Sequence, residues 1–161
     1  MKREEPIELF MPPNMLKAKI GGGMSGMDMA AVKRAQQAME ELKGEFAAWL
    51  AEDLRILVGA RASYAEAPQA EARAALLRAA HDIKGQAATF HYPLIARVAG
   101  SLSKLIGELP ETAALPLSLI DAHVNAILVI HKQAMQDTSD EIALALCSEL
   151  EARVEELLAP K

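Results

Sequence analysis

The stretch His81-Asp82-Ile83-Lys84-Gly85-Gln86 places an imidazole, an ammonium group and a glycine within about one turn of a predicted helix. Residues three and four apart on a helix share one face, so Lys84 and Gly85 lie beside His81. An exposed imidazole that is neutral at the pH of the cell is available as a nucleophile. A glycine in a helix interior costs about 1 kcal/mol relative to alanine. At Gly85, the missing side chain lets a bulky partner approach the imidazole.

Lys84 gains a role if His81 is phosphorylated, because a phosphoryl group brings up to about two negative charges. A lysine one turn away neutralises part of that charge as a mobile point charge. Asp82 follows His81 directly and points about 100° away on a helix, so it is expected on the solvated surface. Gln86 points away for the same reason, unless it touches a partner at the rim. The helix has an inward-facing apolar seam at Leu76, Ala80, Ile83, Ala87 and Phe90, which leaves His81 on the flank and at least partly exposed.

Other kinds of active site find little support in the sequence. His91, His123 and His131 are expected to be structural or surface residues, since no spacing typical of a metal site connects them. The single cysteine excludes an internal disulfide and a multi-cysteine metal site. The glycine run at 21–23 lacks the lysine and hydroxyl residue of a phosphate-binding loop. We therefore expect no bound cofactor and no metal in this chain.

The composition favours a helical protein. Of the 161 residues 52% are hydrophobic but only 4% are aromatic, which suits helices packed closely through small residues. The formal net charge of −5 argues against a general nucleic-acid binder. No apolar run approaches the roughly 20 residues that span a bilayer, and the N-terminus lacks the apolar core of a signal peptide. We expect a cytoplasmic protein that does not bind membranes.

Five helical stretches follow an N-terminal tail or docking strap at residues 1–27. The predicted helices cover about 29–59, 68–91, 94–109, 116–137 and 138–158, and a capping-box pattern of Thr138 with Glu141 starts the last one. Pro68, Pro93 and Pro116 begin helices, since proline is well tolerated in a first turn. Short loops between long amphipathic helices favour antiparallel neighbours. The expected fold is all-α, an up-down antiparallel four-helix bundle over residues 28–158 with an additional N-terminal segment or helix.

The motif His81-x-x-Lys84-Gly85, followed by small residues and Phe90, resembles that of histidine phosphotransfer (HPt) domains. The resemblance is strongest from His81 to Leu105 and extends over roughly residues 28–158. It implies a four-helix bundle that shuttles a phosphoryl group between receiver-domain aspartates in a two-component phosphorelay. By position, His81 is the phosphoacceptor, Lys84 stabilises the phosphoryl charge and Gly85 gives access. It also implies that the receiver, a response-regulator domain or part of a hybrid kinase, supplies the aspartate and its Mg²⁺, and that this chain has no ATP-dependent kinase activity of its own.

The receiver is expected to dock on the exposed parts of the second and third predicted helices. Apolar or small side chains near His81 form the contact centre, and basic ones complement an acidic partner. The residues are Leu77 and Ala88 at the centre, Arg73, Arg78 and Lys84 as cations, and Ser103, Lys104 and Arg97 on the following helix. A monomer suffices for such a module.

Two positions depart from the usual pattern of the family. Many members have a glycine where this chain has His91, so the end of the motif helix is expected to differ in shape. Many also have a glutamine near the position of Ser103, and a serine has less reach toward the histidine site.

Two alternatives to a phosphotransfer shuttle stay open at this point. One is the dimerisation and phosphoacceptor region of a histidine kinase, including a chemotaxis kinase module. That region usually has a proline soon after the motif, where this chain has Gly85-Gln86-Ala87, and a kinase also needs an ATP-binding α/β domain. The other is a non-catalytic helical scaffold with an incidental histidine.

Overall fold

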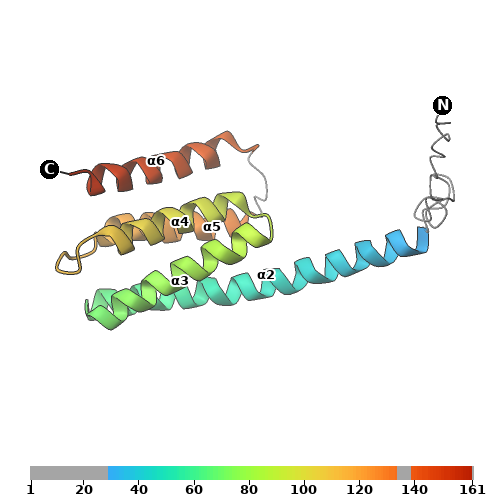
Figure 1. Ribbon diagram of the computed structural model, residues 1–161, viewed down its shortest axis with the longest axis horizontal. Coiled ribbons are helices and arrows are strands. Elements are labelled where there is room, and N and C mark those ends of the chain that lie inside the picture. Colours follow the sequence, from blue (N-terminus) through green and yellow to red (C-terminus); the bar gives the residue numbers. More distant parts are fainter. Residues whose placement is uncertain (1–28, 134–138, 161) are drawn as a thin grey trace, which may run out of the picture. The chain divides into compact units, whose positions relative to one another are not determined.

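The computed structural model describes residues 29–133 and 139–160, and within these ranges it contains five helices and no strand (Figure 1). The helices are α2 (Met29–Glu66), α3 (Ala70–Thr89), α4 (Pro93–Glu108), α5 (Leu117–Lys132) and α6 (Glu141–Leu158). The chain divides into two compact units, Met1–Glu40 and Glu41–Lys161, and the second holds the helical bundle. The predicted all-α bundle is confirmed, whereas the predicted tail, residues 1–27, lies outside the described residues.

α4 is the central helix of the second unit, because it packs against α3, α5 and α6. α5 also contacts α6. α2 joins α3 through the stacked rings of Phe46 and Phe90, whose centroids are 4.1 Å apart. It joins α5 through a bidentate pair between Arg61 and Asp121. Each helix of the second unit therefore has at least one partner along its apolar face.

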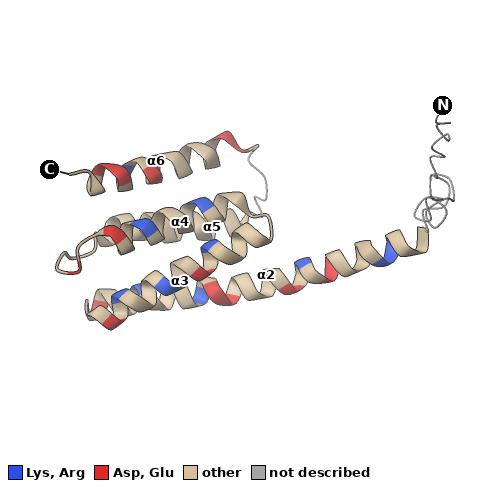
Figure 2. Cartoon of the chain, in the orientation of Figure 1, with Lys and Arg blue, Asp and Glu red and all other residues tan. Residues whose placement is uncertain are grey.

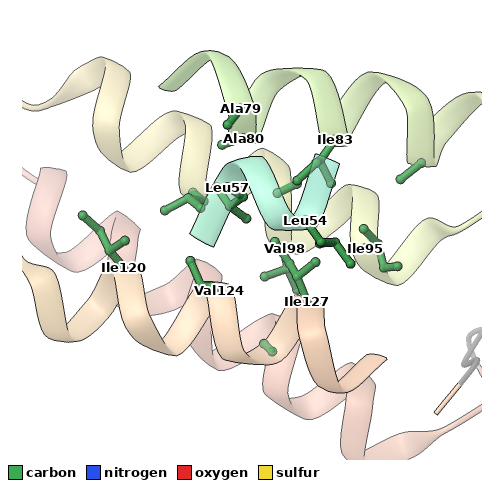
Figure 3. Packing of buried hydrophobic residues seen from close by; sticks show 14 of the residues in the cluster. Leu54, Leu57, Ala79, Ala80, Ile83, Ile95, Val98, Ile120, Val124 and Ile127 are labelled. Carbon is green, nitrogen blue, oxygen red and sulfur yellow. The ribbon is translucent and has the colours of Figure 1, made fainter. Parts of the chain in front are cut away.

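Apolar side chains from all five described helices form one core, and Figure 3 labels residues from four of them. Those labelled are Leu54 and Leu57 from α2, Ala79, Ala80 and Ile83 from α3, Ile95 and Val98 from α4, and Ile120, Val124 and Ile127 from α5. The predicted seam of α3 is buried as expected, with Leu76, Ala80, Ile83 and Ala87 inaccessible and Phe90 half-buried. Burying this seam fixes the rotation of α3 and turns its opposite face to solvent.

Several helix boundaries differ from those expected. α3 begins at Ala70 and not at Pro68, and α5 ends at Lys132 and not near residue 137. α2 does not stop near Gly59 but continues to Glu66, because Arg61 and Tyr64 bind α5 and the loop before it and so hold the last two turns. α6 is capped by Asp140, whose carboxylate accepts from the backbone N–H groups of Ile142 and Ala143. The expected cap, Thr138, lies outside the described residues. None of the described helices is both long and apolar enough to cross a membrane.

Two glycines of α4 lie against side chains of α3 and reveal the register of the two helices. A Cβ atom added at Gly100 would lie 3.6 Å from Cδ and Cε of Lys84, and one at Gly107 would lie 3.8 Å from Cδ1 of Leu77. In both contacts the two residue numbers add up to the same value, as they must along one antiparallel helix pair. The same register places Ser103 on α4 at the level of His81 on α3.

The end of α3 has a left-handed residue, His91, with φ of 62°. The N–H of Tyr92 donates to the carbonyl of Ala87 at 2.8 Å, and that of Phe90 donates to Gln86 at 3.0 Å. The first of these bonds closes the helix in the manner of a Schellman motif, where glycine is the usual left-handed residue. Here His91 adopts the glycine-like conformation, so the turn forms in spite of the side chain.

Candidate functional site

His81 lies on the solvent-exposed face of α3, at one edge of a shallow hollow. The hollow has a volume of about 310 Å³ and is lined by His81, Asp82, Gly85, Gln86, Thr89 and Phe90. Its floor is α3 itself, and Phe90 connects it to Trp49 of α2 through an edge-to-face ring contact. Within the described residues the imidazole has no hydrogen bond or ion pair. It is therefore available to a group that arrives from outside.

Gly85 lies in the interior of α3, and a Cβ atom placed on it would meet no atom within 4 Å. Its backbone is ordinary helix, and its φ is not positive. The glycine is thus required neither by packing within the described part of the chain nor by an unusual backbone conformation. Its carbonyl accepts from Oγ1 of Thr89 at 2.9 Å, which continues the low surface of the hollow toward the helix end.

Lys84 lies along α4, with its methylenes over Gly100. It borders a groove of about 520 Å³ whose other walls come from α4 and α6. Among the described residues it forms no ion pair, unlike the two other cations at this groove. Arg97 binds Glu151 through two hydrogen bonds, and Lys104 binds Glu155. Lys84 therefore keeps an uncommitted charge one turn from His81.

The remaining predicted contact residues occupy different environments. Arg78 and Ala88 are exposed on α3, whereas Leu77 is half-buried against Gly107. Arg73 is used within the fold, since its guanidinium donates to four backbone carbonyls at the end of α4 and in the following loop. Figure 2 shows acidic residues concentrated on α6, which supplies the partners of Arg97 and Lys104.

Ser103 lies level with His81, but its hydroxyl donates to the carbonyl of Ala99 in its own helix at 2.9 Å. No described contact joins it to His81. The hydroxyl thus completes a local bond of α4, and the longer reach of a glutamine is absent at this position.

Sequence reasoning overlooked Asp53 of α2, whose carboxyl lies within reach of a side-chain hydrogen bond from Gln86 of α3, a residue that lines the hollow. Burial raises the pKa of Asp53, and the negative charge of Asp82 raises it further. Gln86 is half-buried, so the structure gives it a contact within the chain in addition to its place at the rim of the hollow. No spacing signal connects residues 53 and 86, because they belong to different helices.

His123 is the most deeply buried of the described histidines. Its Nδ1 donates to the carbonyl of Leu119 at 2.7 Å, and its Nε2 accepts from the hydroxyl of Ser101 at 2.9 Å. Both ring nitrogens are satisfied by a neutral imidazole, which fits the structural role expected of it. Within the described residues, no group of three or more histidine, cysteine or acidic side chains is arranged to hold a metal ion.

A family model described as Hpt domain matches residues 41–159, which is most of the chain and nearly all of the second compact unit. The chain belongs to the Hpt domain family. The function of this Hpt protein is histidine phosphotransfer in a two-component phosphorelay, with receiver domains and histidine kinases as the interacting partners. No curated protein and no solved structure matches the chain.

Proposed function

We propose that His81 is the phosphoacceptor of this Hpt domain and that it exchanges a phosphoryl group with receiver-domain aspartates. The observation that carries the proposal is the exposed imidazole of His81, which has no partner among the described residues, beside a glycine that no packing contact in this part of the chain requires. The other described histidines differ from it in burial, backbone conformation or helix, and none of them has this pairing of a lysine and a glycine.

In the transfer step, the unprotonated imidazole nitrogen of His81 attacks the phosphorus of an aspartyl phosphate. The N–P bond forms as the P–O bond to the aspartate breaks, and the electron pair leaves with the aspartate carboxylate. The second ring nitrogen carries its proton through the step. Lys84 neutralises part of the charge on the phosphoryl oxygens, and Gly85 lets the two reactive groups align. Alignment and charge stabilisation are the main demands of phosphoryl transfer.

The receiver docks over the hollow and the adjoining face of α3. Ala88 and Leu77 provide the apolar contact, and Arg78 provides a cation with no acidic partner among the described residues. Ser103 and Lys104 lie at the edge on α4, where Lys104 exchanges Glu155 for an acidic group of the receiver. We also propose that the protein acts as a cytoplasmic monomer.

One labelling experiment tests the reaction. The full chain is incubated with a phosphorylated receiver domain, or with ATP alone. Acid-labile, alkali-stable label is expected only with the receiver, and it should be absent in His81→Gln. His131→Gln is the matched control, because His131 lies on α5 away from the hollow, and it should accept label normally. Label from ATP alone would show that the protein is a kinase. If no receiver transfers label, the protein is instead a non-catalytic helical scaffold.

The docking surface has its own test in Arg78→Glu. Reversing a charge at a contact that is not buried mainly slows association, so the transfer rate should fall at low salt and approach the wild-type rate at high salt. Equal rates for both proteins across several salt concentrations would contradict the electrostatic part of this docking surface.

A further inference from the structure

Two buried side-chain oxygens between α2 and α3 have no hydrogen-bond donor among the described residues. They are Oδ2 of Asp53 and Oε1 of Gln86, and both are shielded from solvent. The same two side chains lie within reach of each other, because a side-chain hydrogen bond from Gln86 is among the influences on the pKa of the Asp53 carboxyl. An ionised carboxylate and an amide oxygen can both only accept. The pair is therefore one donor short.

A single proton supplies the missing donor. When it is bound to Oδ2 of Asp53, the resulting O–H group can donate to Oε1 of Gln86, while the other carboxyl oxygen keeps its bond from the amide. A carboxylic acid and a primary amide then form a closed pair with two hydrogen bonds. Without the proton, both buried oxygens lose the hydration that they had in the unfolded chain and gain no partner in exchange.

The charges around Asp53 favour the protonated form. Burial is the largest influence that raises the pKa of its carboxyl, and the negative charges of Asp82 on α3 and of Glu52 on α2 act in the same direction. The hydrogen bond from Gln86 lowers the pKa and opposes them. Arg55, the nearest cation along α2, is paired with Glu52 on the exposed surface. On the flank of α2 that faces α5, His131 borders a separate hollow with Arg55, and neither of them is among the groups that shift Asp53.

We propose that Asp53 and Gln86 form a proton-binding clamp, in which one proton between Oδ2 and Oε1 joins α2 to α3 at the wall of the His81 hollow. Because the folded chain binds this proton more tightly than the unfolded chain, its stabilising effect is complete at acidic pH. The effect is lost as the pH rises through the pKa of folded Asp53.

A link to phosphotransfer follows, and this part rests on the proposed role of His81. Gln86 and Asp82 both border the hollow, so ionisation of Asp53 adds negative charge behind the wall that a phosphoryl group would approach. Two negative charges in one region oppose each other's formation. Phosphorylation of His81 should therefore raise the pH at which the clamp opens.

The decisive variant is Asp53→Asn, because an asparagine amide reproduces the hydrogen-bonding pattern of the protonated acid at every pH. In the wild-type chain, ¹³C-carboxyl NMR should show Asp53 titrating at higher pH than the exposed aspartates. Chemical unfolding at pH 8 should give an unfolding constant about tenfold smaller for Asp53→Asn than for wild type, equivalent to about 1.4 kcal/mol. The difference should vanish at acidic pH, where the wild-type pair is closed. An Asp53 that titrates with the exposed aspartates would overturn the clamp, as would an Asn variant that is less stable at pH 8.

Asp82→Asn is the matched control, since it removes one negative charge beside Asp53 and leaves the buried pair intact. It should move the Asp53 midpoint to lower pH while the alkaline loss of stability persists. An unchanged midpoint would contradict the assigned influence of Asp82. None of these measurements requires a phosphoryl group, so a failure of the clamp is distinguishable from a failure of His81 to accept phosphate.

Discussion

Gly85 lowers the stability of its helix, and no contact among the described residues compensates for this. A glycine inside a helix is about 1 kcal/mol less favourable than alanine, and the space for a methyl group at this position is empty. The two structural reasons for a helix glycine, a close contact or a helix end, are both absent. What a methyl group would obstruct is therefore not found among the described residues. The role of the glycine is to leave room for the partner that reacts with His81.

Gly85→Ala should separate stability from activity. The variant should be more stable than wild type by about 0.5–1 kcal/mol in urea unfolding. Its transfer rate with a phosphorylated receiver should fall by about tenfold or more, because phosphoryl transfer depends on close alignment of the reacting groups.

Gly59→Ala is the matched control, since Gly59 is also exposed within a helix and a methyl group added to it would meet no neighbouring atom. It should gain similar stability and transfer at the wild-type rate. A Gly85→Ala protein that transfers as fast as Gly59→Ala would contradict the role in access.

At the scale of the element, the sequence predicts α3 better than it predicts its neighbours. The apolar seam determines which face of α3 is buried, and that is enough to place His81, Lys84 and Gly85 on the exposed side. Contacts between helices are different, because they depend on the register of two segments that periodicity treats separately. The bond between Asp53 and Gln86 and the contact of Lys84 with Gly100 are both of this kind.

Some helix ends can be predicted from the sequence, and others depend on contacts between helices. Proline positions anticipate the starts of α4 and α5 to within one residue. The sequence pattern underestimates the length of α2, since the last two turns depend on contacts of Arg61 and Tyr64 with residues more than 50 positions away. Such tertiary contacts outweigh the low helix propensity of Gly59, where the helix was expected to end. The substitution at His91, in contrast, is visible in the sequence, and in the structure this residue adopts the left-handed conformation that glycine favours.

His91→Gly should stabilise the end of α3. A residue with a Cβ atom pays roughly 1–2 kcal/mol in the left-handed region, and the greater freedom of an unfolded glycine offsets part of the gain. The net increase in unfolding free energy should be about 0.5–1 kcal/mol, measured by urea denaturation. His91→Ala keeps the Cβ atom and should bring no such gain. Equal stability of the two variants would show that the backbone of residue 91 is not strained.

At the scale of the helical bundle, polar pairs between helices add to the packing of the apolar core. Arg97 and Lys104 bind α6 to α4, and Arg73 binds the start of α3 to the end of α4. These contacts hold the surroundings of Lys84, and no described helix covers the face that carries His81. The molecule thus combines a rigid support with one open reactive face, which is what transfer between aligned groups requires.

Stability of the bundle should also decrease at acidic pH because of His123. Burial lowers the pKa of this imidazole, and a second proton would give Nε2 a hydrogen facing the hydroxyl of Ser101. The unfolded chain therefore binds more protons than the folded chain below about pH 6.5, the ordinary pKa of histidine. The stabilising effect of neutral His123 is present above that pH and is lost as the pH falls through the folded pKa.

Urea unfolding between pH 5 and pH 8 should reveal this titration as a decline of up to about 1.4 kcal/mol per pH unit on the acidic side. In His123→Gln the decline should be absent, although the variant starts from a lower stability because a buried pair is altered. His131→Gln, which replaces a half-buried histidine of the same helix, should retain the decline. His123 stabilises the folded chain at alkaline pH and the clamp at Asp53 stabilises it at acidic pH, so His123→Gln and Asp53→Asn should remove pH dependences of opposite sign. A profile that stays flat below pH 6.5 in the wild-type chain would show that His123 is protonated without cost in the core.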